Sequence, residues 1–122
     1  MKIILADHHL QALQALKIML QEQPKFEVTG DARDAYKLLN LVIETPPDLV
    51  LMDMELPGMS NTNLINELHK VEPKPIVVVM GISSNHGRMI IKAGADAFIS
   101  KSDPPDWVLE TLQKFESDFD KS

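Results

Sequence analysis

The sequence contains no cysteine, which excludes disulfide bonds and metal sites built on thiolates. It also contains no long hydrophobic segment. The apolar start, residues 3–6, is far shorter than the roughly 18 residues of a membrane span, and it lacks the apolar region of a signal peptide. Basic residues are few, with 12 Lys and Arg against 18 Asp and Glu. We therefore expect a cytoplasmic protein with no membrane segment and no direct contact with nucleic acid.

The composition is that of an ordinary globular domain, with 44% hydrophobic and 25% charged residues. We expect a single domain over residues 1–122, with its core over residues 2–116. Three short runs that are almost continuously apolar suit central parallel strands, which are covered on both faces, and two more mixed runs suit outer strands. The predicted strands lie near residues 2–6, 26–30, 48–52, 75–80 and 96–100.

Between the strands, apolar residues recur with helical spacing. The predicted helices lie around residues 10–20, 35–42, 64–71, 84–93 and 108–115, and the fourth pattern is the weakest because its apolar residues are adjacent. Ser60, Asn61 and Thr62 are candidates to cap the third helix, Gly94 follows the fourth, and Pro104–Pro105 open the fifth. Trp107 is expected to pack the last helix, with an exposed dimer face as the alternative. Five such units predict a flavodoxin-like, doubly wound α/β fold: a five-stranded parallel sheet of order 2-1-3-4-5 with five helices.

Charged residues follow three of the predicted strands: Asp7 the first, Asp53 the third and Lys101 the fifth. In sheets of this kind, ligands bind beyond the carboxyl ends of the strands, where the strand order reverses. We therefore expect the three side chains to share a solvent-facing notch. Two carboxylates held close together repel each other, and Lys101 would partly offset that repulsion.

Three segments carry a family resemblance: DLVLMDMELPGMS around Asp53, KPIVVVMG over the fourth predicted strand, and AGADAFISKSDPP around Lys101. With them, the chain resembles the receiver domain of two-component response regulators, especially the branch with a LuxR-type DNA-binding output. The resemblance covers residues 2–116. It implies a phosphoacceptor signalling domain and not an enzyme, at most one that phosphorylates itself from small donors. It implies no organic cofactor.

The resemblance also implies a role for each matched residue. Asp53 accepts a phosphoryl group from a histidine kinase, and Lys101 and Gly81 contact that group. Asp7, Asp53 and the backbone carbonyl of Glu55 hold Mg²⁺, which neutralises phosphoryl oxygens. The small Gly81 leaves the acceptor accessible, and Phe98 takes the place of the switching aromatic residue. A homodimer partner or an effector domain would bind the face formed by the fourth helix, fifth strand and fifth helix.

Two residues depart from the family pattern. His8 stands where a second acidic residue usually follows Asp7, and imidazole suits zinc, copper or nickel better than Mg²⁺. Weak Mg²⁺ binding is therefore expected, with Mn²⁺ as the alternative ion and His8 as a doubtful ligand. Met80 stands where a Ser or Thr hydroxyl usually captures the phosphoryl group, and a thioether has no donor; Ser83 and Ser84 follow soon after. A pseudo-receiver that docks or dimerises without phosphorylation is the alternative to a working phosphoacceptor.

The segment Asp7-His8-His9 raises further alternatives. A protonated His8 could stand in for a cation between the two carboxylates. A metallohydrolase is disfavoured, because adjacent histidines in an extended segment point to opposite sides, and because His69 and His86 are expected to be solvated. A cobalamin-binding domain has a similar motif, but Ala12 stands where that motif has glycine. An FMN site would need a phosphate-binding loop that the sequence lacks. His9 is expected to be an ordinary residue of the resembled family.

Overall fold

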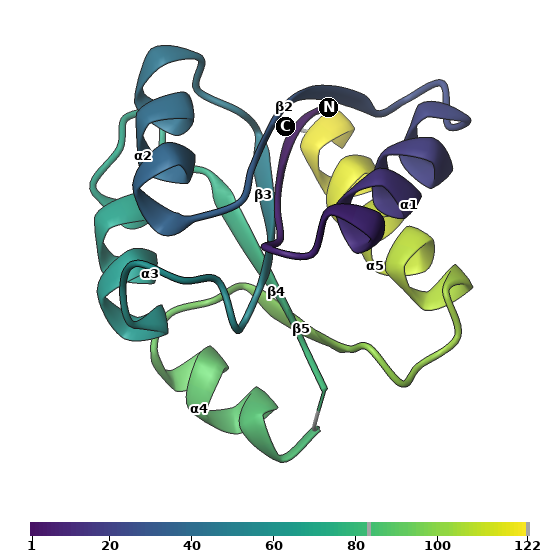
Figure 1. The fold of residues 1–122 in the computed structure, drawn as a ribbon. Helices are drawn as coiled ribbons and strands as arrows, with labels where there is room; N and C mark the ends of the chain where they lie inside the picture. Colours follow the sequence, from purple (N-terminus) through teal and green to yellow (C-terminus); the bar gives the residue numbers. More distant parts are fainter. Residues whose placement is uncertain (83, 122) are drawn as a thin grey trace.

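The computed structural model describes residues 1–82 and 84–121. Within them, five parallel strands form one sheet of order β2-β1-β3-β4-β5, which confirms the predicted topology. In this part of the chain, four α-helices and one short 3₁₀ helix, η1, connect the strands, and a fifth α-helix follows β5 (Figure 1). In chain order the elements are β1 Lys2–Ala6, α1 Leu10–Gln21, β2 Glu27–Ala32, α2 Ala35–Glu44, β3 Leu49–Asp53, α3 Asn61–His69, β4 Ile76–Gly81, η1 Ser84–His86, α4 Gly87–Lys92, β5 Ala97–Ser100 and α5 Asp106–Lys121.

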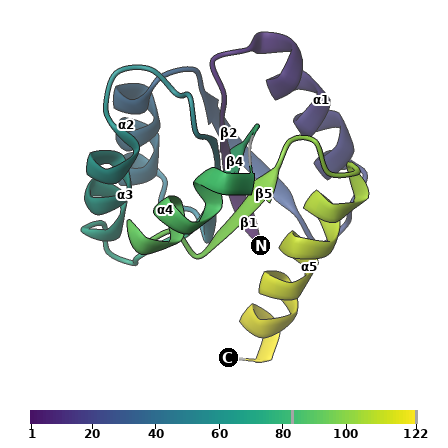
Figure 2. The same cartoon turned by 90° about the horizontal axis from the view of Figure 1, so that it is seen from below.

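Different helices cover the two faces of the sheet. α1 and α5 lie on one face, and α2, α3 and α4 lie on the other (Figures 1 and 2). Consecutive strand residues point to opposite faces, so Leu51 packs in the α1–α5 layer whereas Val50 and Met52 pack in the α2–α4 layer. All five residues of β3 are buried, as predicted for a central strand. This buried strand carries its last residue, Asp53, to the carboxyl edge of the sheet.

The helix ends follow the predicted signals. The Ser60 hydroxyl accepts a hydrogen bond of 3.2 Å from the backbone N–H of Asn63, which satisfies one of the free donors in the first turn of α3. Gly94 follows α4 with a φ of +114°, a backbone conformation that favours glycine. Pro104–Pro105 directly precede Asp106, the first residue of α5.

Two local features differ from expectation. The fourth helical segment is divided into η1 and a short α4, and only Ile90 of its adjacent apolar residues is buried, while Met89 and Ile91 are exposed. A longer amphipathic helix would need its apolar residues three or four positions apart. The expectation that Trp107 packs the last helix is wrong, because half of its surface is exposed in the first turn of α5.

His69, at the end of α3, is only partly exposed, which corrects the expectation that it is a solvated surface residue. Its Nε2 is buried and has no hydrogen-bond partner among the described residues. The ring lies against Gly94, where a Cβ would come within 3.2 Å of the His69 Cε1. Burial lowers the pKa of His69 below its ordinary value; the positive charge of Lys74 acts in the same direction, and Asp96 opposes both.

We expect acid to destabilise the fold through His69. Because folding lowers its pKa, the unfolded chain takes up the proton more readily. The stability contribution is therefore present above a pH of about 6.5 and lost as the pH falls through the lowered folded-state pKa. Urea unfolding near pH 7.5 and near pH 5.5 should show a smaller acid-induced loss for His69→Gln than for the wild type. An equal loss in the two proteins would contradict this assignment.

Candidate functional site

Three strand ends bring charged side chains together at one edge of the sheet. Asp7 follows β1, Asp53 ends β3, and Lys101 follows β5. The Lys101 Nζ lies 3.1 Å from the Asp7 Oδ2 and 3.2 Å from the Asp53 Oδ1, so the predicted clustering of these residues is confirmed. The sequence also predicts that these side chains face solvent. The two carboxylates do not, because Asp7 is only 2% exposed and Asp53 only 4% exposed.

Backbone hydrogen bonds hold this group in place. The N–H of Asp7 donates to the carbonyl of Ala32 at 3.1 Å, and the N–H of Lys101 donates to the carbonyl of Gly81 at 2.7 Å. Burial works to lower the pKa of the Lys101 ammonium, but its hydrogen bond to Asp7 and the negative charges of Asp53 and Asp7 outweigh burial, so the pKa is raised. Lys101 is therefore a fixed positive charge between two buried carboxylates.

The chain turns sharply after Asp7. The Asp7 Oδ1 accepts a hydrogen bond of 2.9 Å from the backbone N–H of His9, a local contact that curls the backbone, and His9 is the N-cap residue of α1. The Arg33 guanidinium donates to the carbonyl of His8 at 3.0 Å. The His8 and His9 rings consequently lie together, with centroids 3.8 Å apart and planes inclined by 43°. The prediction that they point to opposite sides is wrong, because the chain bends at His8 before α1 begins.

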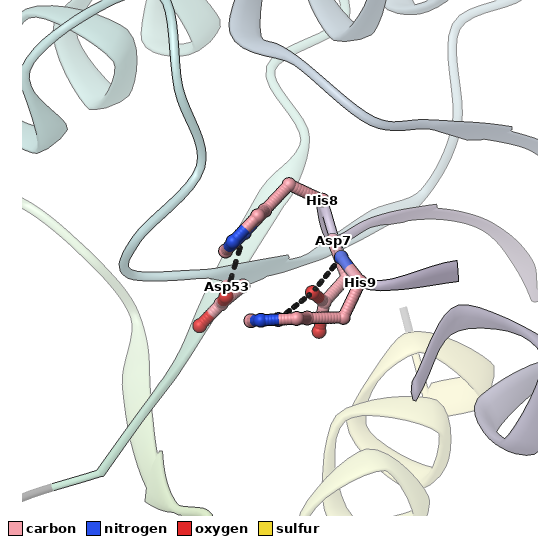
Figure 3. Close-up of side chains that lie close together, drawn as sticks. All are labelled: Asp7, His8, His9 and Asp53. Atoms are coloured by element: carbon pink, nitrogen blue, oxygen red, sulfur yellow. Dashed lines mark hydrogen bonds and ion pairs between the residues drawn. The ribbon is translucent and has the colours of Figure 1, made fainter. Parts of the chain in front are cut away.

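Both imidazoles face the carboxylate pair (Figure 3). The His8 Nδ1 lies 3.7 Å from the Asp53 Oδ2, and the His9 Nδ1 lies 3.3 Å from the Asp7 Oδ1. Treating His9 as an ordinary residue therefore missed its place in the site. The spacing Asp-x-His could have indicated it, because an Asp side chain commonly accepts a hydrogen bond from the backbone two residues later.

The last two residues of β4, Met80 and Gly81, lie on opposite sides of the sheet. Met80 packs in the α1–α5 layer, whereas the ring of Phe98 packs against the α2–α4 layer. The ring lies close to Gly81, where a Cβ would be 2.9 Å from the Phe98 Cε2, and close to Gly87, where a Cβ would be 3.0 Å from the Cδ1. Gly81 therefore lies on the same side of β4 as the Phe98 ring, whereas Met80 faces the other layer.

Three further residues are candidates for the site: Glu55, Ser83 and Ser84. Glu55 lies in the turn after β3 with its side chain exposed, and its backbone carbonyl as a metal ligand stays a prediction. Ser83 lies outside the described residues, and Ser84 begins η1.

Residues 3–113 match the response regulator receiver domain family. The chain belongs to this family. It is 32% identical over 115 residues to the transcriptional regulatory protein YhcZ of Bacillus subtilis, covering 93% of this chain and 54% of YhcZ. It is 26% identical over 114 residues to the nitrate/nitrite response regulator NarL of Escherichia coli K12, covering 92% of this chain and 53% of NarL. The receiver chain thus spans about half the length of these relatives.

Solved structures share the receiver fold. A LuxR-family response regulator from Aurantimonas superposes with a TM-score of 0.86 at 23% identity, covering 95% of this chain and 84% of that chain. The signal receiver domain of NarL from Mycobacterium tuberculosis gives 0.85 at 19% identity, covering 95% of each chain. The family assignment favours the receiver over the cobalamin, flavin and metallohydrolase alternatives, and a two-component receiver implies a histidine kinase partner. None of the described helices has the length and apolar character of a membrane span.

Proposed function

We propose that this receiver accepts a phosphoryl group on Asp53 from a phosphohistidine of a histidine kinase. The observation that carries the proposal is the placement of Asp53 beside a second carboxylate, Asp7, with the ammonium of Lys101 in contact with both, 3.1 and 3.2 Å away. A carboxylate is a nucleophile for phosphoryl groups when charge is compensated nearby. Lys101 supplies that compensation as a point charge.

In the proposed transfer, an Asp53 carboxylate oxygen forms a P–O bond as the P–N bond of the phosphohistidine breaks. The bonding electron pair passes to the leaving imidazole nitrogen, which takes up a proton. Lys101 stays paired with the added negative charge. The Asp53 Oδ2 is covered by the His8 ring, so the approaching donor must displace His8, which is about one third exposed and lies outside the strands.

A divalent cation is expected to take part in such a transfer by neutralising the phosphoryl oxygens. The carboxylates of Asp7 and Asp53 suit any divalent cation. They fit Mg²⁺ only in part, because Mg²⁺ requires a near-octahedral shell of oxygens and two of the four residues clustered here, His8 and His9, offer nitrogen. No step proposed here therefore passes through Mg²⁺.

Mass spectrometry after incubation with acetyl phosphate, in the presence of Mg²⁺ and separately Mn²⁺, tests the proposal. We expect a mass gain of one phosphoryl group that is absent in Asp53→Asn. Asp31→Asn is a matched control, because Asp31 also lies near a strand end and pairs with a lysine, Lys17, but lies outside the cluster; this variant should keep the gain. A gain that persists in Asp53→Asn would contradict Asp53 as the acceptor.

One observation favours a second candidate, a docking module that works without phosphorylation. The residue facing Phe98 is a glycine, and the ring occupies the space that a side chain at position 81 would need. Position 81 therefore lacks a hydroxyl that could bind the phosphoryl group and, by moving toward it, let the Phe98 ring change position. The face formed by α4, β5 and α5 would then bind a second copy or an effector domain in one fixed state. Absence of a mass gain with either metal would leave this docking function.

A further inference from the structure

Four residues bring donor atoms together beside the carboxyl edge of the sheet: the Asp7 Oδ1 faces the His9 Nδ1, and the Asp53 Oδ2 faces the His8 Nδ1. One ligand atom from each residue lies within 4.8 Å of all the others. The pairs that face each other directly are 3.3 Å and 3.7 Å apart. Half of this donor set is nitrogen, so it is not simply an acidic cluster.

The carboxylate oxygens are divided between two kinds of neighbour. The Asp7 Oδ2 and the Asp53 Oδ1 contact Lys101, which leaves the other oxygen of each carboxylate facing an imidazole. Two of the inward-facing atoms, the His8 Nδ1 and the Asp53 Oδ2, are buried and have no hydrogen-bond partner in the described part of the chain. Asp53 is 96% buried, since its exposed fraction is 4%, and buried polar atoms are rarely left without a partner. These two atoms point at a ligand between them.

We propose that Asp7, His8, His9 and Asp53 form a tetrahedral site for a divalent transition metal ion of the zinc class. Zn²⁺ takes four ligands, with bonds of about 2.0–2.1 Å to imidazole nitrogen and carboxylate oxygen, so neighbouring donors in a regular tetrahedron lie about 3.3–3.4 Å apart. Two of the six donor separations, at 3.3 Å and 3.7 Å, approach that spacing, and all six lie within 4.8 Å. Two imidazoles favour zinc, copper, nickel or cobalt over Mg²⁺, which prefers oxygen.

The local fold holds these donors at the site. The backbone hydrogen bond from His9 to Asp7 fixes the turn that aims both rings inward, and Arg33 anchors the carbonyl of His8. Lys101 contacts the other oxygen of each carboxylate and partly neutralises them, which leaves a binding site of reduced negative charge. The inference concerns the same carboxylates as the proposed phosphoryl transfer but does not rest on that transfer.

Metal titration of the full chain, without a histidine tag, tests the site. We expect Zn²⁺ to bind with a stoichiometry of one ion per chain by calorimetry, and Co²⁺ to give the visible absorption bands of tetrahedral coordination. Excess Mg²⁺ should not displace either ion. In His8→Asp the Zn²⁺ affinity should fall by at least about tenfold, and Mg²⁺ should then compete better, because three of the four donor side chains become carboxylates and only the His9 imidazole remains.

The matched control is His86→Gln, since His86 is an exposed histidine in η1 that lies outside the cluster. This variant should bind Zn²⁺ and Co²⁺ as the wild type does. Zn²⁺ affinity that is unchanged in both His8→Gln and His9→Gln would overturn the proposal, as would displacement of Zn²⁺ by an equal concentration of Mg²⁺. Because these readouts use no phosphodonor, a failure here is distinct from a failure of phosphorylation at Asp53.

Discussion

Replacing Lys101 with methionine is expected to destabilise the fold by about 3 kcal/mol, because the change leaves two buried negative charges without their cation. Asp7 and Asp53 are almost fully buried, and the Lys101 Nζ contacts an oxygen of each. Methionine keeps most of the volume of the lysine stem, so the loss reports on the charge more than on packing. Urea unfolding at neutral pH measures the difference.

A surface ion pair provides the control for this variant. Lys70 pairs with Glu67 at 3.0 Å, with both side chains well exposed, and such pairs contribute at most about 0.5 kcal/mol on a helix. Lys70→Met should therefore change the stability little. The double variant Lys101→Met/Asp53→Asn should recover part of the loss, because only one buried carboxylate then remains charged. A loss under about 1 kcal/mol in Lys101→Met would show that water or the imidazoles already compensate the carboxylates.

The sequence is sufficient to predict the clustering of Asp7, Asp53 and Lys101, because apolar runs fix the parallel strands and parallel strands end at a common edge. It is not sufficient to predict the orientation of His8 and His9. Strand periodicity predicts opposite sides, but the backbone bends at His8, where the His9 N–H donates to the Asp7 carboxylate across the bend. A side-chain contact to the backbone overrides periodicity there.

The sequence is also not sufficient to predict which of the last two residues of β4 faces Phe98. Sequence spacing places Met80 and Gly81 equally near the end of the strand, and a shift of one residue moves a side chain to the other face of the sheet. The register between β4 and β5, in which Val79 pairs with Phe98, decides the matter, because Val79 and Gly81 share a face two residues apart. Such a register depends on contacts between distant segments and cannot be read from one strand alone.

This register leads to a prediction about Gly81. A Cβ there would lie 2.9 Å from the Cε2 and 3.0 Å from the Cζ of Phe98, and 3.1 Å from the Sδ of Met54. These contacts are too close, so Gly81→Ala should force the ring outward and destabilise the fold by about 1–3 kcal/mol. Gly30→Ala is the matched control, because its Cβ would meet the Leu41 side chain at an ordinary 3.5 Å, and it should be close to neutral.

A double-mutant cycle identifies the cause of that loss. If the clash with Phe98 is responsible, Gly81→Ala should cost little in a Phe98→Ala background, and the coupling between the two changes should account for most of the single-variant effect. Independent, additive losses would instead place the strain at Met54. The result also bears on signalling: if a side chain at position 81 and the inward ring exclude each other, the glycine is what allows Phe98 to lie in its inward position. Phosphorylation of Asp53 would then need a route other than a hydroxyl at position 81 to move that ring.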